Sequence, residues 1–289
     1  MVVIKLDEIN TKLPAEKIGV DMGQSLSKIA YLEGSNLHLL SFPTQAYLGY
    51  FRESIEPIIK NFSQISYTGG KSFSQFKYYS NSIKTNLINE FEANVKGVET
   101  FHLIEKKKDL SNSLIVTIGT GTSMVSKKDT FEHLGGSALG GGFFMGLLKI
   151  LFNTDDFQEA LEIAKKGTRY NVDLKVSDIY APEDNRVNML FREFTAASLG
   201  KIDHSFSLNN LNKRDFINSL ICMIGENIGM LANLMADKNE ISKIAFCGGF
   251  LKENRIAKKI LSLICNVNKK KAIFLKHPEF CAALGALLL

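Results

Sequence analysis

Short apolar runs separated by polar turns make up the first part of the chain. Three of them have the length and composition of β-strands: residues 17–20, 28–32 and 37–42. Residues 33–36, between the last two runs, are typical of a turn. A further run at 64–68 ends at Gly69 and Gly70. The pattern predicts a strand meander followed by a fourth strand with a glycine turn behind it.

The spacing then becomes helical. Residues 86–102 are expected to form a helix, with Asn86 as its N-cap. The positions that share one face of this helix are Leu87, Phe91, Val95, Val98 and His102.

A second series repeats the outline of strand, glycine turn, strand and later helix. It begins at residues 113–118, continues with a strand at 123–126 and includes a buried strand at 244–247. Helices are expected at residues 143–152, 155–165, 215–236, 253–264 and 280–289. We therefore expect two related lobes, an N-terminal one at residues 1–111 and a C-terminal one at residues 112–289.

Composition narrows the class of protein. The 289 residues are 45% hydrophobic and 22% charged, as in soluble globular proteins. The net charge of +5 is dispersed, and its short lysine runs at 106–108 and 269–271 are typical of solvated helix ends rather than of nucleic-acid or membrane binding. No stretch approaches the ~18–20 apolar residues of a membrane span, and the start lacks the order of a signal peptide.

Four cysteines lie far apart in apolar surroundings, which favours free thiols in a reducing cytoplasm over a disulfide or a metal site. They are Cys222, Cys247, Cys265 and Cys281.

Glycine-rich segments carry the candidate chemistry. They occupy residues 21–28, 119–123, 135–142 and 247–250. A glycine turn after a strand lets backbone N–H groups approach a phosphate, because no Cβ stands in the way. Each turn by itself can equally be a tight turn without a ligand. Together they predict a nucleotide between two related halves, with the helix start after Gly140 as an anion site.

These segments resemble the acetate-and-sugar-kinase/Hsp70/actin superfamily and, within it, the type II (eukaryotic-like) pantothenate kinases. The similarity runs from Ile18 to the C-terminus through residues 21–28, 89–97, 118–123, 134–147, 171–180, 195–200, 248–254 and 283–287. It implies an α/β, two-domain actin-like (ribonuclease H-like) fold with duplicated mixed sheets flanked by helices. The implied reaction is phosphorylation of the 4′-hydroxyl of pantothenate by MgATP, the first step towards coenzyme A. The family also implies a homodimer and makes coenzyme A or an acyl-coenzyme A a candidate inhibitor.

The resemblance assigns roles to individual residues. Glu90 matches the catalytic glutamate and is expected to be the general base, with Glu92 as the alternative that the residues alone leave open. Asp21 would hold Mg²⁺, directly or through water. Ser123 and His133 would contact the substrate. The expected ATP-binding residues are Asp21, Gly23, Gln24, Ser25, Leu26, Ser27, Lys28, Thr120, Gly121, Gly141, Gly142, Phe143, Phe144, Met145, Phe157, Gly248 and Gly249.

Several of these assignments compete with plainer explanations. Asp21 can satisfy a local turn, Lys28 can point to solvent, and Phe157 can be a core residue. Gln24 stands where the family has a second glycine, so a positive φ there would be strained. His133 stands where the family has an arginine, which replaces a permanently charged fork by an imidazole.

The last two departures keep alternatives open. The chain could be a non-catalytic relative that binds a nucleotide or an acyl-coenzyme A, or a kinase of the same fold for another hydroxyl substrate.

Overall fold

The computed structural model describes residues 1–6, 13–44, 48–186, 188 and 192–289. Its first sheet has six strands in the order β1-β4-β3-β2-β5-β6. The strands are β1 (Val2–Lys5), β2 (Lys17–Met22), β3 (Leu26–Glu33), β4 (Asn36–Pro43), β5 (Gln64–Thr68) and β6 (Lys84–Leu87). Neighbours from β1 to β2 are antiparallel, whereas β2, β5 and β6 are parallel. The expected meander and fourth strand are confirmed.

The second sheet repeats this plan with five strands in the order β13-β12-β7-β8-β9. They are β7 (Ser113–Ile118), β8 (Thr122–Lys127), β9 (Phe131–Ser137), β12 (Lys243–Cys247) and β13 (Lys271–Phe274). Strands β7, β8 and β9 form the antiparallel meander, and β12 and β13 continue in parallel from β7. In each sheet the meander's first strand therefore adjoins the parallel strands, and a glycine turn follows it.

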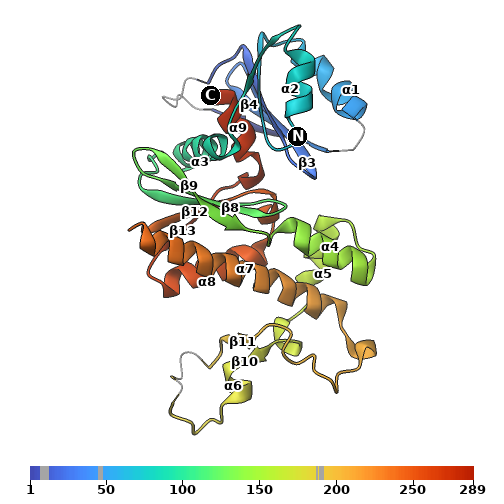
Figure 1. Ribbon diagram of the computed structural model, residues 1–289, viewed down its shortest axis with the longest axis vertical. Helices are drawn as coiled ribbons and strands as arrows, with labels where there is room; N and C mark the ends of the chain where they lie inside the picture. Colours follow the sequence, from blue (N-terminus) through green and yellow to red (C-terminus); the bar gives the residue numbers. More distant parts are fainter. Residues whose placement is uncertain (7–12, 45–47, 187, 189–191) are drawn as a thin grey trace.

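Helices and sheets alternate in layers (Figure 1). Helices α1 (Leu48–Ile59) and α2 (Phe73–Tyr79) cover the outer face of the first sheet, and α3 (Glu90–Lys106) and α9 (Cys281–Leu288) lie between the two sheets. Helices α4 (Gly141–Phe152), α5 (Phe157–Ala164), α7 (Lys213–Lys238) and α8 (Arg255–Val267) cover the remaining face of the second sheet. The period of two along β7 explains the layering: Leu114 and Val116 face the α7 side, while Ile115 faces α3.

Glycines allow the backbones of α3, α9 and the first sheet to pack closely together. A Cβ on Gly97 of α3 would lie 1.8 Å from the carbonyl oxygen of Cys281, and one on Gly285 of α9 would lie 1.8 Å from that of Ala93. A Cβ on Gly19 of β2 would lie 2.2 Å from the carbonyl oxygen of Ala283. The last helix of the chain therefore packs backbone to backbone on the first sheet. Residues on the two sides of the expected boundary after residue 111 are thus in close contact.

Residues 169–186 and 192–210 form an excursion beyond α7 and α8, at the bottom of Figure 1. It contains the short elements η1 (Arg169–Asn171), β10 (Leu174–Lys175), α6 (Val176–Ile179), β11 (Thr195–Ala197) and η3 (Leu208–Asn210).

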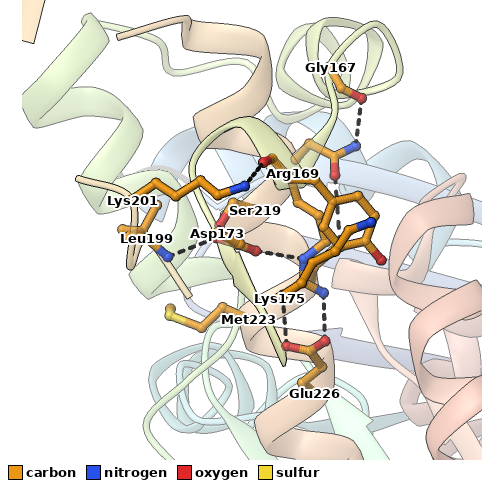
Figure 2. Close-up of polar contacts among 12 residues, drawn as sticks. Gly167, Arg169, Asp173, Lys175, Leu199, Lys201, Ser219, Met223 and Glu226 are labelled. Carbon is orange, nitrogen blue, oxygen red and sulfur yellow. Dashed lines mark hydrogen bonds and ion pairs between the residues drawn. The ribbon is translucent and has the colours of Figure 1, made fainter. Parts of the chain in front are cut away.

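Figure 2 shows how the excursion is fastened to α7. The buried guanidinium of Arg169 donates from Nε to Asp173 at 2.6 Å and makes a two-pronged contact with Glu226 at 2.5 and 2.9 Å. The second oxygen of Asp173 accepts from Ser219 of α7 and from the backbone N–H of Leu199. Fully bonded partners of this kind make a buried charge tolerable.

Helix α7 is long and apolar enough to cross a membrane by length and composition, with a mean hydropathy of 1.4 over its most apolar window. Inside the protein 61% of that window is buried. It packs against α5, α8 and the second sheet, which is the environment of a core helix.

Candidate active site

The first glycine turn connects β2 to β3. Asp21 lies near the end of β2 with only 5% of its surface exposed, and its Oδ2 accepts a hydrogen bond from Nζ of Lys28 at 2.9 Å. The turn is closed by the N–H of Gly23, which donates to Leu26 at 3.1 Å. Lys28 therefore points to Asp21 and not to solvent, and the two form a partly buried ion pair.

Gln24 and Ser25 are the exposed tip of this turn. Gln24 is not among the described residues with positive φ, so the strain expected from its Cβ does not arise. Ser27 belongs to β3; its buried hydroxyl bonds Thr44 at 2.8 Å inside the lobe. Of the serines expected at a phosphate, only Ser25 has an exposed side chain here.

The start of α3 places Glu90 beside this turn. Asn89 is the N-cap: its Oδ1 accepts from the N–H groups of Phe91 at 2.8 Å and Glu92 at 3.3 Å. The expected cap at Asn86 is wrong, because Asn86 lies in β6, where it pairs with Ser66.

Glu90 is reachable from solvent, yet protein atoms crowd it enough that desolvation raises its carboxyl pKa. The negative charge of Asp21 raises this pKa further, and the positive charge of Lys28 opposes the shift. The charges of Asp21 on β2 and Lys28 on β3 therefore act on the Glu90 carboxyl at the start of α3.

Gly69 is a site residue that the sequence analysis marked only as a turn. Its φ is +88°, and a Cβ there would lie 2.6 Å from Oδ1 of Asp21. Lys71, two residues on, donates its N–H to the carbonyl of Met22 at 3.0 Å, and Thr68 Oγ1 donates to the carbonyl of Ile88 at 3.0 Å. The end of β5 therefore contacts both Asp21 and the segment that leads into Glu90. The glycine pair after a strand was the signal for it.

The second glycine turn lies between β7 and β8, against the start of α4. Gly141 donates its N–H to the carbonyl of Gly119 at 2.7 Å, and Gly142 donates to Thr120 at 2.9 Å. These two N–H groups are therefore engaged by the turn, which corrects the expectation of a bare anion site at this helix start. Thr120 and Gly121 are exposed at the tip of the turn.

The third turn follows β12 and touches the second. Gly248 has φ +101°, donates its N–H to Pro278 at 2.8 Å, and would place a Cβ 2.3 Å from the carbonyl oxygen of Ile118. Gly249 has open space where a Cβ would stand. The turns at 119–121 and 248–249 therefore form one glycine-lined surface at the ends of two adjacent parallel strands.

The aromatic residues expected near the adenine belong largely to the core. Phe144 is fully buried, and its ring centroid lies 5.9 Å from that of Phe157 and 5.7 Å from that of Phe250. Phe157 and Met145 are partly buried against the same cluster, whereas Phe143 is 37% exposed. This supports the core explanation for Phe144 and Phe157 and leaves Phe143 as the accessible ring.

The two substrate candidates lie on the second sheet beside α3. Ser123 of β8 shares the α3 face with Val125, because side chains alternate along a strand. His133 of β9 is exposed, and its ring stacks on Phe91 with centroids 4.0 Å apart and planes 12° apart. Since Phe91 follows Glu90, the stack brings His133 to the same end of α3.

The geometry thus joins two groups of residues. One is a carboxylate, lysine and carboxylate set on the first lobe and α3, and the other is a glycine-lined surface on the second lobe with Ser123 and His133 beside it. Among the described residues no cluster of three or more His, Cys, Asp or Glu side chains could hold a metal ion by itself. A carboxylate with a raised pKa on the same structure as exposed glycine turns is an arrangement that suits the transfer of a phosphoryl group to a hydroxyl.

Comparison with known proteins agrees with this chemistry. A model of the Fumble family matches residues 32–289. The chain is similar to the type II pantothenate kinase of Bacillus thuringiensis subsp. konkukian (strain 97-27), with 35% identity over 279 residues that cover 94% of this chain and 96% of the relative. It is also similar to the type II pantothenate kinase of Oceanobacillus iheyensis, with 30% identity over 94% of this chain and 99% of that one.

Solved structures share the fold at much lower identity. The ethanolamine utilization protein EutJ from Carboxydothermus hydrogenoformans has a TM-score of 0.57 at 13% identity, over 97% of this chain and 92% of that one. A ROK family glucokinase from Streptomyces griseus, in complex with glucose and AMPPNP, has a TM-score of 0.57 at 10% identity, over 94% of this chain and 97% of that one. The expected two-lobe actin-like fold is confirmed by this likeness.

Proposed function

The chain belongs to the Fumble family, and we propose that it catalyses the reaction for which its curated relatives are named, the ATP-dependent phosphorylation of pantothenate. The product is 4′-phosphopantothenate, and the step is the first of coenzyme A biosynthesis. The observation that carries the site assignment is the position of Glu90, a carboxylate with a raised pKa next to Asp21 and Lys28.

Glu90 acts as the general base. The 4′-hydroxyl oxygen forms the new bond to the terminal phosphorus of ATP, the bond from that phosphorus to the bridging oxygen breaks, and ADP leaves. The hydroxyl proton passes to a carboxylate oxygen of Glu90, a contribution of typically ~10²–10⁴-fold. Its raised pKa makes it a better proton acceptor than an ordinary glutamate.

The nucleotide phosphates lie between the two glycine turns. Backbone groups around Gly23 and Ser25 meet them from the first lobe, and Thr120 and Gly121 meet them from the second. The ribose and purine lie along Gly249, where no Cβ intrudes. Lys28 exchanges part of its bond to Asp21 for a phosphate oxygen.

Asp21 is the residue that fits a Mg²⁺ ion. Mg²⁺ takes only one or two carboxylates and completes its shell with waters and substrate phosphates, so one partly buried carboxylate at a phosphate turn meets its need. Bound there, the ion would neutralise charge on the phosphates. The ion pair with Lys28 holds the Asp21 carboxylate ready.

His133 and Ser123 hold pantothenate. Stacking on Phe91 fixes the plane of the His133 ring and leaves its edge nitrogens free to donate towards the substrate's carboxylate or the transferring phosphate. The Ser123 hydroxyl lies on the same side of the sheet.

We further propose that the protein is a cytoplasmic homodimer that coenzyme A or an acyl-coenzyme A inhibits. The α7–α8 face, made of Met230, Leu234, Leu263 and Val267, supports the dimer because these apolar side chains are 42–62% exposed on two adjacent helices. Light scattering tests it: Leu234→Glu should halve the particle mass, and a wild-type monomer would contradict the dimer.

ADP release with MgATP, measured with and without pantothenate, tests the reaction. Glu90→Gln should abolish pantothenate-dependent release while leaving ATP binding nearly unchanged, and Glu92→Gln two positions on is the matched control. Full activity of Glu90→Gln would remove Glu90 as the base. Release that pantothenate does not stimulate, but another alcohol does, would favour a kinase of the same fold, and ATP binding without turnover would favour a binding protein.

A further inference from the structure

A polar side chain lies buried between α3 and the second sheet. Asn94 is 4% exposed, and its Nδ2 donates to the backbone carbonyl of Glu90 at 3.0 Å. Its Oδ1 accepts from the thiol of Cys247 at 4.0 Å, at the long end for a sulfur donor. The same thiol lies 3.2 Å from Oγ1 of Thr117. The amide thus connects the first turn of α3 to two strands of the second lobe.

Stability alone does not explain this residue. Its neighbours on α3 are Ala93, Val95 and Val98, which pack into an apolar cluster. Asparagine is a weak helix former, and burying its amide is unfavourable unless both ends are bonded. The carbonyl of Glu90 does not require it, because helix geometry already offers that oxygen a backbone N–H. A leucine has the same branched arrangement of heavy atoms and no polar group to satisfy.

The place of its partners suggests a use. Cys247 is the last residue of β12 and directly precedes Gly248, while Thr117 lies two residues before Gly119. Asn94 follows Glu90 by one helical turn. A short chain of polar contacts therefore runs from the backbone of the proposed base to the strands that carry both glycine turns of the second lobe.

We propose that Asn94 is a positioning residue for phosphoryl transfer, which fixes the first turn of α3, and so Glu90, relative to the nucleotide turns. The inference rests on the proposed function of Glu90. Asn94 touches no reacting atom and acts through the Glu90 backbone. An error of about 1 Å in the position of a catalytic group can lower a rate by ~10²-fold, so a single buried contact suffices.

Asn94→Leu tests the role, with Thr100→Val as its matched control. Thr100 is also 4% exposed on α3 and donates to the carbonyl four residues back, at 2.8 Å, but that bond stays within the helix. We expect Asn94→Leu to lower kcat by about tenfold, with KM for ATP and for pantothenate within twofold of wild type, and Thr100→Val to leave kcat unchanged. A folded Asn94→Leu with wild-type kcat, or equal losses in both variants, would overturn the proposal.

Two further variants separate the bonds. Asn94→Ser can keep a hydroxyl bond to Glu90 but is too short for Cys247, so its kcat should fall as in Asn94→Leu. Cys247→Ala should lower kcat similarly, and the double variant Asn94→Leu/Cys247→Ala should lose no more than either single variant. Full additivity, or wild-type kcat in Asn94→Ser, would contradict the link between the lobes.

The same variants distinguish this inference from the proposed function. If the wild-type chain released no ADP with pantothenate, the proposed function would fail. The urea unfolding midpoints of the single and double variants would then decide the contact: coupled shifts would support it, and additive shifts would overturn it.

Discussion

The backbone contact between α3 and α9 is the most demanding packing feature of the protein, and Gly97→Ala tests it. Gly97 is buried in the middle of α3, facing the carbonyl oxygen of Cys281. Adding a methyl group there changes no charge and no hydrogen bond. Any loss of stability therefore reports the closeness of the two helices.

The magnitude follows from two opposing effects. The new Cβ would stand 1.8 Å from that oxygen, and real contacts of this kind are never below 3.0 Å, so the helices must separate locally by about 1.2 Å. Overpacking that moves backbone costs up to ~3 kcal/mol, whereas exchanging glycine for alanine inside a helix contributes about 1 kcal/mol of stability. We expect a net loss of about 2 kcal/mol.

Urea unfolding of a matched pair measures this difference. Gly146 lies in α4 with nothing within 4 Å of an added Cβ, so Gly146→Ala should gain about 1 kcal/mol from helix propensity alone. The two variants should therefore differ by about 3 kcal/mol at equal denaturant dependence. A stabilised Gly97→Ala would refute the close crossing. Because α3 carries Glu90, turnover of Gly97→Ala should fall as well.

Three other predictions concern single residues. Desolvation and a neighbouring carboxylate raise the Glu90 pKa above its ordinary value of 4.5, so the stability that the protonated group contributes declines as pH rises from 4.5 through the raised pKa. Glu90→Gln should therefore match wild type in acid and unfold at higher urea concentrations near neutral pH. Identical profiles of the two proteins would argue against the shift. Gly69→Ala should lose at least about 1 kcal/mol and weaken turnover, because its φ of +88° suits glycine and its Cβ would push the Asp21 carboxylate. Gly70→Ala, with open space around its Cβ, is the control in both assays. Arg169→Met should cost ~3–5 kcal/mol in urea unfolding, since it leaves a buried carboxylate without its partner, and a loss below about 1 kcal/mol would mean that the pair is hydrated.

The repeated sheets could be read from the sequence because each of their signals is local. The run at 113–118 has the apolar character of a strand with both faces covered, and Gly119 ends it. Its structural bounds coincide with the expected ones. The same holds for 64–68, where a short run of strand-forming residues and the glycine pair behind it define the strand without reference to the rest of the chain.

The start of α3 could not be fixed in this way. Asn86 and Asn89 are both good caps, and Leu87 continues the helical spacing towards Asn86. Pairing of β6 with β5 decides the matter, since it takes Asn86 into the sheet and leaves Asn89 to bond two helical N–H groups. A contact across about twenty residues of sequence outweighs the local preference.

The supporting residues of the site were missed for a related reason. Nothing local marks Phe91 as the platform for His133, because the stacking partner lies 42 positions further along, on another strand. Asn94 shows no unusual feature in the sequence, and its meaning depends on a thiol in the second lobe. Nothing local marks Gly97 or Gly285 as contact residues, yet a Cβ on either would lie 1.8 Å from a carbonyl oxygen of the other helix.

The middle layer explains why some parts of the candidate site could be predicted from the sequence and others could not. The glycine turns end strands within single lobes, so short segments specify them. Glu90 instead belongs to α3, which packs on both sheets and on the last helix of the chain, where Ala283, Leu284 and Leu287 are fully buried. The position of the proposed base is therefore set by residues from both ends of the sequence, because Ala283 of α9 packs against Gly19 of β2. Each glycine turn is specified by a short segment, whereas the position of the proposed base relative to the turns depends on the assembled layers.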